Sequence, residues 1–229
     1  MEKFKYNTID EAIAAIKAGK MVLVTDDEDR ENEGDLIMAA INFMAKEARG
    51  LICMPADSEV MDKLQFGAMV THNTDNHETA FSVSIDHVDT TTGISAYERA
   101  YTMKKCAEPG AQPSDFRRPG HVFPLRARKG GVLVRTGHTE TTVDLCKLAG
   151  LQPVGICCEI MNDDGHMART PDLIEFAKKH KLVFITVAEL VAYRKAHEKM
   201  VHRAAEAALP TKYGNFRIIA YENDLDNLC

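Results

Sequence analysis

The feature that most constrains this chain is an acidic run at 26–35, DDEDRENEGD, in which seven of ten residues are carboxylates. An apolar, β-branched run at 21–25 precedes it and a second apolar run at 36–41 follows it, and both are typical of buried strands. The carboxylates of such a turn repel one another, and a hard divalent cation such as Mg²⁺ prefers carboxylate oxygens as ligands. We therefore expect a cation here, although composition alone favours a solvated acidic turn.

Length and composition are those of an ordinary globular protein. The 229 residues are 45% hydrophobic and 27% charged, which is enough for one substantial core. The net charge of −6 opposes nucleic-acid binding, and no apolar run approaches transmembrane length, so we expect neither a nucleic-acid nor a membrane partner. The N-terminus has no apolar signal segment, and we expect a cytoplasmic protein.

The sequence patterns alternate between helix and strand, which predicts an α/β fold. A capping box at Thr8 opens a helix that runs through Ile16 and stops at Gly19. The predicted strands are 21–25, 36–41, 51–54, 81–88, 121–125, 131–135, 154–160 and 182–187. The other predicted helices are 44–49, 58–65, 96–106, a helix from about Thr139 to Leu148, 170–180 and 188–208, with loops at 67–80 and 108–120.

Two predicted helix starts carry polar groups suited to a phosphate. The turn before 96–106 offers the hydroxyls of Thr92 and Ser95, although Ser95 is equally well explained as an ordinary N-cap. At the second start, Arg135, His138 and Thr139 surround the helix N-terminus. Free N–H groups there attract a phosphate, and an arginine adds a forked, charge-assisted pair.

Two further residues stand out in strand-like segments. Glu159 lies near the end of an apolar strand, and because burying an isolated carboxylate is costly, it is either paired or functional. Cys53 ends another strand and is a candidate for substrate contact, although a core thiol is slightly favoured. The six cysteines lack paired metal-ligand spacing, so we expect reduced and mostly buried thiols.

Several motifs together resemble those of the 3,4-dihydroxy-2-butanone 4-phosphate synthase family of riboflavin biosynthesis, and the resemblance covers roughly residues 5–205. The motifs are the acidic run, CMP at 53–55, TTGIS at 91–95, HVFPLR at 121–126, GVLVRTGHTETTVDL at 131–145 and CEIMNDDG at 158–165. Their shared order is far more specific than any single motif.

The resemblance implies a mixed parallel and antiparallel sheet flanked by helices. It implies conversion of D-ribulose 5-phosphate into L-3,4-dihydroxy-2-butanone 4-phosphate and formate, with one or two Mg²⁺ or Mn²⁺ ions, in a homodimer. By motif, Glu31 and His138 are the implied metal ligands, and His121 and Glu159 are the implied catalytic residues. The implied substrate-binding positions are Arg30, Glu31, Asp35, Arg135, Thr136, Gly137, His138, Thr139 and Glu159.

The C-terminal part has a separate likeness. Residues 209–221 resemble the opening strand of GTP cyclohydrolase II, and only Cys229 follows where that enzyme has a zinc-binding cysteine cluster. We therefore expect a synthase domain at 1–205, followed at 206–229 by a linker and the start of a truncated cyclohydrolase-like segment.

Two other functions are weighed against the synthase. A nucleotide- or RNA-modifying protein of similar mixed α/β fold requires a basic groove, which the net charge opposes. A non-catalytic metal-binding or regulatory module leaves Arg135, His138 and Glu159 without a role.

Overall fold

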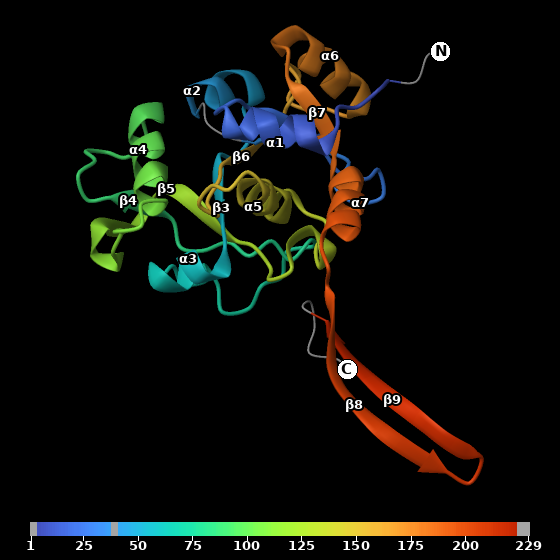
Figure 1. The fold of residues 1–229 in the computed structure, drawn as a ribbon. Helices are drawn as coiled ribbons and strands as arrows, with labels where there is room; N and C mark the ends of the chain where they lie inside the picture. The colour runs from blue at the N-terminus through green and yellow to red at the C-terminus, as the bar shows by residue number, and fades with distance from the viewer. Residues whose placement is uncertain (1–3, 38–40, 224–229) are drawn as a thin grey trace.

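The computed structural model describes residues 4–37 and 41–223, and strands within them form one mixed sheet. The strands are β1 (Val22–Thr25), β2 (Gly34–Ile37), β3 (Cys53–Ala56), β4 (Ile85–His87), β5 (Phe116–Arg126), β6 (Cys157–Glu159) and β7 (Val183–Thr186). Their order is β4-β5-β3-β6-β2-β1-β7 (Figure 1). The β1–β7 and β3–β5 pairs are parallel and the other pairs are antiparallel, which confirms the predicted mixed α/β fold.

Helices cover both faces of this sheet and create two apolar cores. One face carries α1 (Ile9–Lys17), the short turn η3 (Gly131–Leu133), α5 (His138–Leu148) and α7 (Val187–His197). The other carries α2 (Ile41–Phe43), η1 (Met44–Ala48), α3 (Ser58–Lys63), α4 (Ala96–Cys106) and α6 (Thr170–His180). No helix in the described residues is both long enough and apolar enough to cross a bilayer.

The capping box predicted for α1 is present. The Glu11 backbone N–H donates to Thr8 Oγ1 at 3.2 Å, and the Thr8 N–H donates to Glu11 Oε2 at 2.7 Å. These two bonds satisfy donors that the helix itself leaves unpaired. They also orient Ile9 and Ile16 into the core beneath the sheet.

The acidic run joins β1 to β2, which pair antiparallel as two neighbouring strands should. β2 begins at Gly34, two residues before the predicted strand, and Ile41 already belongs to α2; residues 38–40 of the prediction lie outside the described residues. The strand predicted at 81–88 is likewise limited to β4, with only isolated bridges at Phe81 and Ser82.

Two predictions between 108 and 135 are wrong. β5 begins at Phe116, so residues 116–120 of the predicted loop are a strand. Arg117 and Arg118 are exposed and donate to the carbonyls of Thr90 and Leu64. The strand predicted at 131–135 is the turn η3, because Gly130 and Gly131 have positive φ angles of 92° and 62°.

The predicted final helix at 188–208 is confirmed only as far as His197, where α7 ends. The alanine-rich continuation forms β8 (Val201–Thr211), which pairs with β9 (Gly214–Asn223) in a hairpin that extends away from the rest of the molecule (Figure 1). Cross-strand pairing here overrides the helical propensity of alanine. The hairpin is exposed along both strands and does not pair with the main sheet.

Deletion of residues 201–229 tests whether the folded body depends on this hairpin. Because the hairpin buries almost nothing, the thermal midpoint should fall by less than about 3 °C, the shift that about 1 kcal/mol produces at this size. As a control, Leu190→Ala empties a fully buried site in α7 and should cost about 2–5 kcal/mol. A deletion as destabilising as Leu190→Ala, measured by calorimetry, would contradict the expectation.

Candidate active site

The acidic loop between β1 and β2 is ordered by its first residue. Asp26 Oδ2 accepts from Arg30 Nη1 at 2.7 Å and from the Glu31 N–H at 3.3 Å, and Asp26 Oδ1 accepts from the Glu33 N–H at 3.0 Å. The tip at 27–29 is exposed, whereas Asp26 is buried. The tip is therefore the solvated acidic turn that composition favours, whereas Asp26 and Asp35 at its two ends are buried, and the expected cation stays a prediction.

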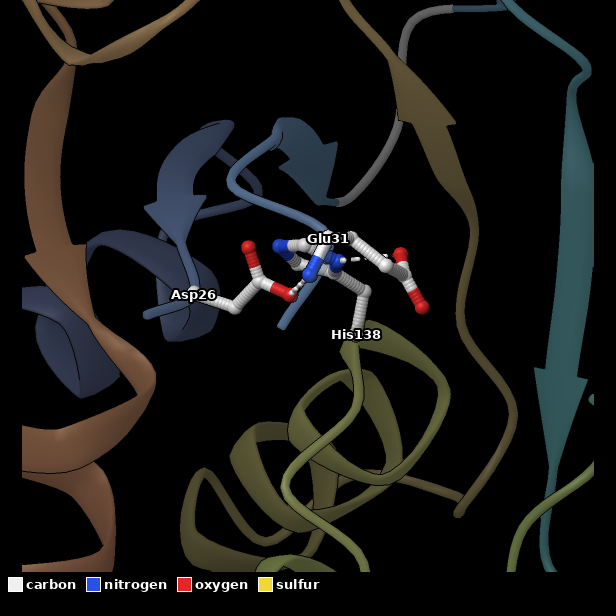
Figure 2. A group of neighbouring side chains, drawn as sticks. All are labelled: Asp26, Glu31 and His138. Atoms are coloured by element: carbon white, nitrogen blue, oxygen red, sulfur yellow. Dashed lines mark hydrogen bonds and ion pairs between the residues drawn. The ribbon is translucent and has the colours of Figure 1, made fainter. Parts of the chain in front are cut away.

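The inward acids meet His138, the first residue of α5. His138 Nδ1 lies 3.9 Å from Glu31 Oε2 and 3.7 Å from Asp35 Oδ1, distances too long for hydrogen bonds but short for opposite charges. The ligand atoms of Asp26, Glu31 and His138 all lie within 4.8 Å of one another. In Figure 2 the imidazole of His138 lies between the carboxylates of Asp26 and Glu31.

Glu159 adds a further carboxylate from the neighbouring strand. It lies directly opposite Asp35 in the β2–β6 pair, so both side chains leave the same face of the sheet. Glu159 Oε2 accepts the Leu51 N–H at 2.8 Å. A β-carbon at Gly50 would collide with Glu159, so only glycine permits this close approach.

Burial and mutual charge shift the pKa values of this cluster. Burial raises the pKa of Asp35 to about 7 despite the nearby imidazole, and burial also raises the pKa of Glu159. For Glu31 the burial effect is outweighed by His138 and Arg30, which lower its pKa to about 2. Burial would lower the pKa of His138, but Asp35 and Glu31 raise it to about 9. The cluster thus combines a charged imidazole with carboxyls of widely different acidity.

The same cluster suits a divalent cation. Asp35 Oδ1 and His138 Nε2 are buried without a hydrogen-bond partner, a costly arrangement unless another group satisfies them. Carboxylate oxygens with one imidazole nitrogen form a donor set that Mg²⁺ or Mn²⁺ accepts. The residues present therefore fit the predicted metal, with Glu31 and His138 as its predicted ligands.

The predicted phosphate site at the start of α5 is only partly free. Thr139 is buried in the first turn, Gly137 is the N-cap and Thr136 is exposed. Arg135 Nη1 donates to Glu140 Oε2 at 2.6 Å, and its other nitrogens donate to the carbonyl of His77 and the hydroxyl of Thr79. Arg135 is therefore held by the protein itself at the edge of the site.

His121 is oriented by an aspartate that the sequence analysis missed. His121 Nδ1 lies 2.8 Å from Asp86 Oδ2, and the His121 N–H donates to Asp86 Oδ1 at 2.9 Å. A carboxylate on Nδ1 leaves Nε2 as the nitrogen that can accept a proton. The sequence signal that could have identified Asp86 was its position as a charged residue inside the strand-like pattern of 81–88.

Strand register places His121 near the same end of the sheet as Glu159. Phe123 lies opposite Cys53, and Cys53 lies opposite Cys157. His121 precedes Phe123 by two residues and Glu159 follows Cys157 by two, and the strands run in opposite directions. The two residues are thus separated by about two strand spacings, roughly 10 Å.

The hydroxyl-rich turn at 91–95 is organised by Glu98. The Glu98 carboxylate accepts from the N–H groups of Thr91 and Gly93, at 2.6 and 3.2 Å, and from Ser95 Oγ at 3.1 Å. Ser95 Oγ in turn accepts the Glu98 N–H, so Ser95 is the N-cap of α4. Thr92 and Ser95 do not line the acidic cavity, and their predicted contact with substrate stays a prediction.

A cavity of about 100 Å³ lies at the centre of the cluster. Most predicted site residues line it, namely Arg30, Glu31, Asp35, Cys53, Arg135, His138, Thr139 and Glu159. His121, Thr136, Gly137, Thr92 and Ser95 are not part of its lining, whereas Thr79, Phe81, Leu125 and Cys157 are and were not predicted. Apolar residues of strands and loops carry no local sequence signal for a site.

Cys53 contributes a protonated thiol to this cavity. Burial, followed by the charge of Glu159, raises the pKa of Cys53, and burial also raises that of Cys157 opposite it. A thiol that stays protonated is a poor nucleophile. This favours contact over covalent chemistry for Cys53, and its role stays a prediction. The five described cysteines are all buried, as predicted, and Cys229 lies outside the described residues.

A family model for 3,4-dihydroxy-2-butanone 4-phosphate synthase matches residues 10–193. The chain belongs to this family. The riboflavin biosynthesis protein RibBA of Aquifex aeolicus (strain VF5) is 58% identical over 234 residues, which cover 98% of this chain and 58% of that protein. The chain thus spans a little over half the length of the curated relatives it matches.

Two solved structures of the family support the assignment. RibBX of A. baumannii, a two-domain 3,4-dihydroxy-2-butanone 4-phosphate synthase, has a TM-score of 0.88 and 44% identity, covering 96% of this chain and 67% of that chain. A synthase in complex with two magnesium ions has a TM-score of 0.82 and 43% identity, covering 84% of this chain and 98% of that chain. The RNA-modifying alternative is not favoured by these matches.

Replacing Glu31 by Gln tests the electrostatic coupling within the cluster. Removing one anion beside the imidazolium should lower the pKa of His138 from about 9 toward its ordinary value. The pKa is measured by NMR titration of the ring signals in the presence of a chelator. Glu28→Gln changes an exposed acid of the same loop and should leave that pKa unchanged, and an unchanged pKa in both variants would contradict the coupling.

Proposed function

We propose that this chain catalyses the conversion of D-ribulose 5-phosphate into L-3,4-dihydroxy-2-butanone 4-phosphate and formate, in the biosynthesis of riboflavin. Family membership gives the reaction class. The observation that carries the proposal is the buried cluster of His138 with Glu31, Asp35 and Glu159, which faces a cavity edged by Arg135.

The reaction must form an enediol, lose water, shift a carbon and release formate, so protons move several times. Asp35, with a pKa of about 7, can gain and lose a proton near neutral pH, and burial raises the pKa of Glu159 above that of an ordinary glutamate. His121, oriented by Asp86, is a further base. We assign acid–base roles to Glu159 and His121 and the orientation of a substrate hydroxyl to Asp35.

We further propose Mg²⁺ or Mn²⁺, as one or two ions, held by Glu31 and His138. A divalent cation supplies Lewis-acid stabilisation of negative charge on substrate oxygens. The unpartnered atoms of Asp35 and His138 support this assignment. Arg30, paired with Asp26 and Glu31, fixes the loop that presents Glu31 to the ion.

The sugar phosphate is assigned to the start of α5. The unpaired N–H groups of the first turn of α5, that of Thr139 among them, and the guanidinium of Arg135 favour an anion beside Thr136 and Gly137, although the Gly137 N–H itself donates to the Arg135 carbonyl at 2.9 Å. The acidic cavity itself repels a phosphate. The reacting carbons are therefore placed toward the carboxylates and the phosphate toward the arginine.

A homodimer is part of the proposal, as is a cytoplasmic location. Ile94 and Tyr97, on the turn that carries Thr92 and Ser95, are 53% and 79% exposed. Apolar side chains exposed together are typical of interfaces. Sedimentation equilibrium of the protein checks the assembly, and a single-chain mass at micromolar concentration would contradict it.

The domain organisation is likewise a proposal. We place the synthase domain at 1–205 and the start of a cyclohydrolase-like segment at 206–229. The exposed hairpin of β8 and β9 supports a second unit, because an isolated two-stranded hairpin is marginally stable in water. A native reading frame that ends at Cys229 would contradict this organisation.

Glu159→Gln tests the proposed mechanism. The amide cannot take up or release the proton, so formate release from ribulose 5-phosphate with Mg²⁺ should fall by at least about a hundredfold, the usual scale of general acid–base catalysis. Formate is measured by a coupled dehydrogenase assay. The Leu51 N–H retains an oxygen acceptor, so the fold should be kept.

The matched control is Glu175→Gln, an exposed acid of α6 that pairs only with Lys178 on the surface. It should keep normal turnover, and a chelator should remove activity from it and from the unaltered protein alike. Near-normal turnover in Glu159→Gln would remove Glu159 from the mechanism. No formate from the unaltered protein with either Mg²⁺ or Mn²⁺ would contradict the function as a whole.

A further inference from the structure

Glu140, in the first turn of α5, is a buried acid that the proposed chemistry does not use. Its side chain is 1% exposed. Glu140 Oε1 accepts the Arg128 N–H at 3.0 Å, and Glu140 Oε2 accepts from Arg135 Nη1 at 2.6 Å. An acid in the first turn ordinarily serves the helix N-terminus, but Glu140 Oε1 accepts a backbone N–H from outside the helix and Oε2 accepts from the Arg135 guanidinium.

The two arginines that Glu140 holds reach the same short segment. Arg135 donates to the His77 carbonyl through two nitrogens, at 3.0 and 3.2 Å, and to Thr79 Oγ1 at 3.2 Å. Arg128 pairs with the Glu78 carboxylate. The segment 77–79 is therefore gripped at each of its residues by an arginine tied to Glu140.

The backbone of segment 77–79 is also held within its own loop, since Asp75 Oδ2 accepts the N–H groups of His77 and Thr79 at 3.1 and 2.9 Å. Glu78 has a φ angle of 55°, a left-handed conformation that costs a residue with a β-carbon about 1–2 kcal/mol. Gly137 makes room for the arginine, because a β-carbon there would collide with the Arg135 guanidinium and the Glu140 carboxylate. The fold thus keeps space for these contacts at the N-cap of α5.

Thr79, the last residue of segment 77–79, lies in the wall of the acidic cavity, and Phe81 continues that wall. Thr79 and Phe81 line both that cavity and a larger hollow of about 470 Å³ on the other side, beside 68–75. At about 100 Å³ the acidic cavity is small beside the ~300 Å³ or more of ordinary ligand pockets. The position of this wall therefore decides how much space a substrate finds.

We propose that Glu140 is a positioning residue which, through Arg135 and Arg128, holds segment 77–79 as the wall between the acidic cavity and the neighbouring hollow. The effect of Glu140 on substrate affinity rests on the proposed function, whereas its effect on the position of segment 77–79 does not. Glu140 transfers no proton in the reaction. It sets substrate affinity by fixing the wall and the direction of the Arg135 guanidinium.

The test compares Glu140→Gln and Arg128→Met with matched controls at exposed positions, Glu59→Gln and Lys129→Met. Hydrogen exchange of the peptide 67–81, followed by mass spectrometry on the protein without substrate, should be about tenfold faster in both test variants, or about 1.4 kcal/mol. The controls should exchange at the original rate.

Kinetics provide the second measurement. KM for ribulose 5-phosphate should rise about tenfold in both test variants, equivalent to about 1.4 kcal/mol, while kcat and its pH profile stay nearly unchanged. Unchanged exchange in both variants, or a loss of kcat at unchanged KM, would overturn the proposal.

Arg128→Met decides the matter if Glu140→Gln does not fold, since its side chain is partly exposed and its backbone bond to Glu140 remains. The exchange measurement needs no turnover. A protein without synthase activity would therefore leave the wall testable, and failure of the proposed function is distinguishable from failure of this inference.

Discussion

The structure depends on a buried imidazole held among carboxylates where β1 turns into β2. Asp35 and Glu159 stand opposite each other on adjacent strands, an arrangement in which like charges repel. His138 reduces this repulsion from above, 3.7 Å from Asp35. The pairing of β2 with β6 therefore depends on the packing of α5 against the sheet, because α5 supplies the positive charge that offsets the repulsion between the two carboxylates.

The first turn of α5 also supplies a negative charge, Glu140, on the side of the helix away from His138. His138 and Glu140 are two positions apart, so their side chains leave the helix about 200° apart. The cationic residue faces the acids of β2 and its preceding loop, and the anionic residue faces Arg128 and Arg135. One helical turn thereby links an acidic compartment to a basic edge, which is the polarity that a phosphorylated sugar needs.

The sequence predicted the features that contiguous residues determine and missed those that depend on contacts between residues far apart in the chain. The acidic run and the start of α5 were recognisable because Asp26 to Asp35 and Arg135 to Thr139 are contiguous patterns. Asp86 was missed because its partner His121 is 35 residues away. Glu140 was missed although Arg135 is only five residues away, because the motif favoured a phosphate as the partner of that arginine. The helix expected through 208 failed beyond His197, since β8 exists only by pairing with β9.

Arg135 belongs to a contiguous sequence motif and also contacts a segment that is distant in the chain. A guanidinium has five N–H donors, and here Nε and Nη2 serve segment 77–79 while Nη1 serves Glu140. A forked pair with a phosphate must therefore take donors from the His77 carbonyl. Because charge-assisted bonds to phosphate are stronger than bonds to a neutral carbonyl, the exchange favours the ligand. In the proposed function a phosphate then competes with the His77 carbonyl for Arg135, while Thr79 Oγ1 and the Arg128–Glu78 pair keep segment 77–79 in place.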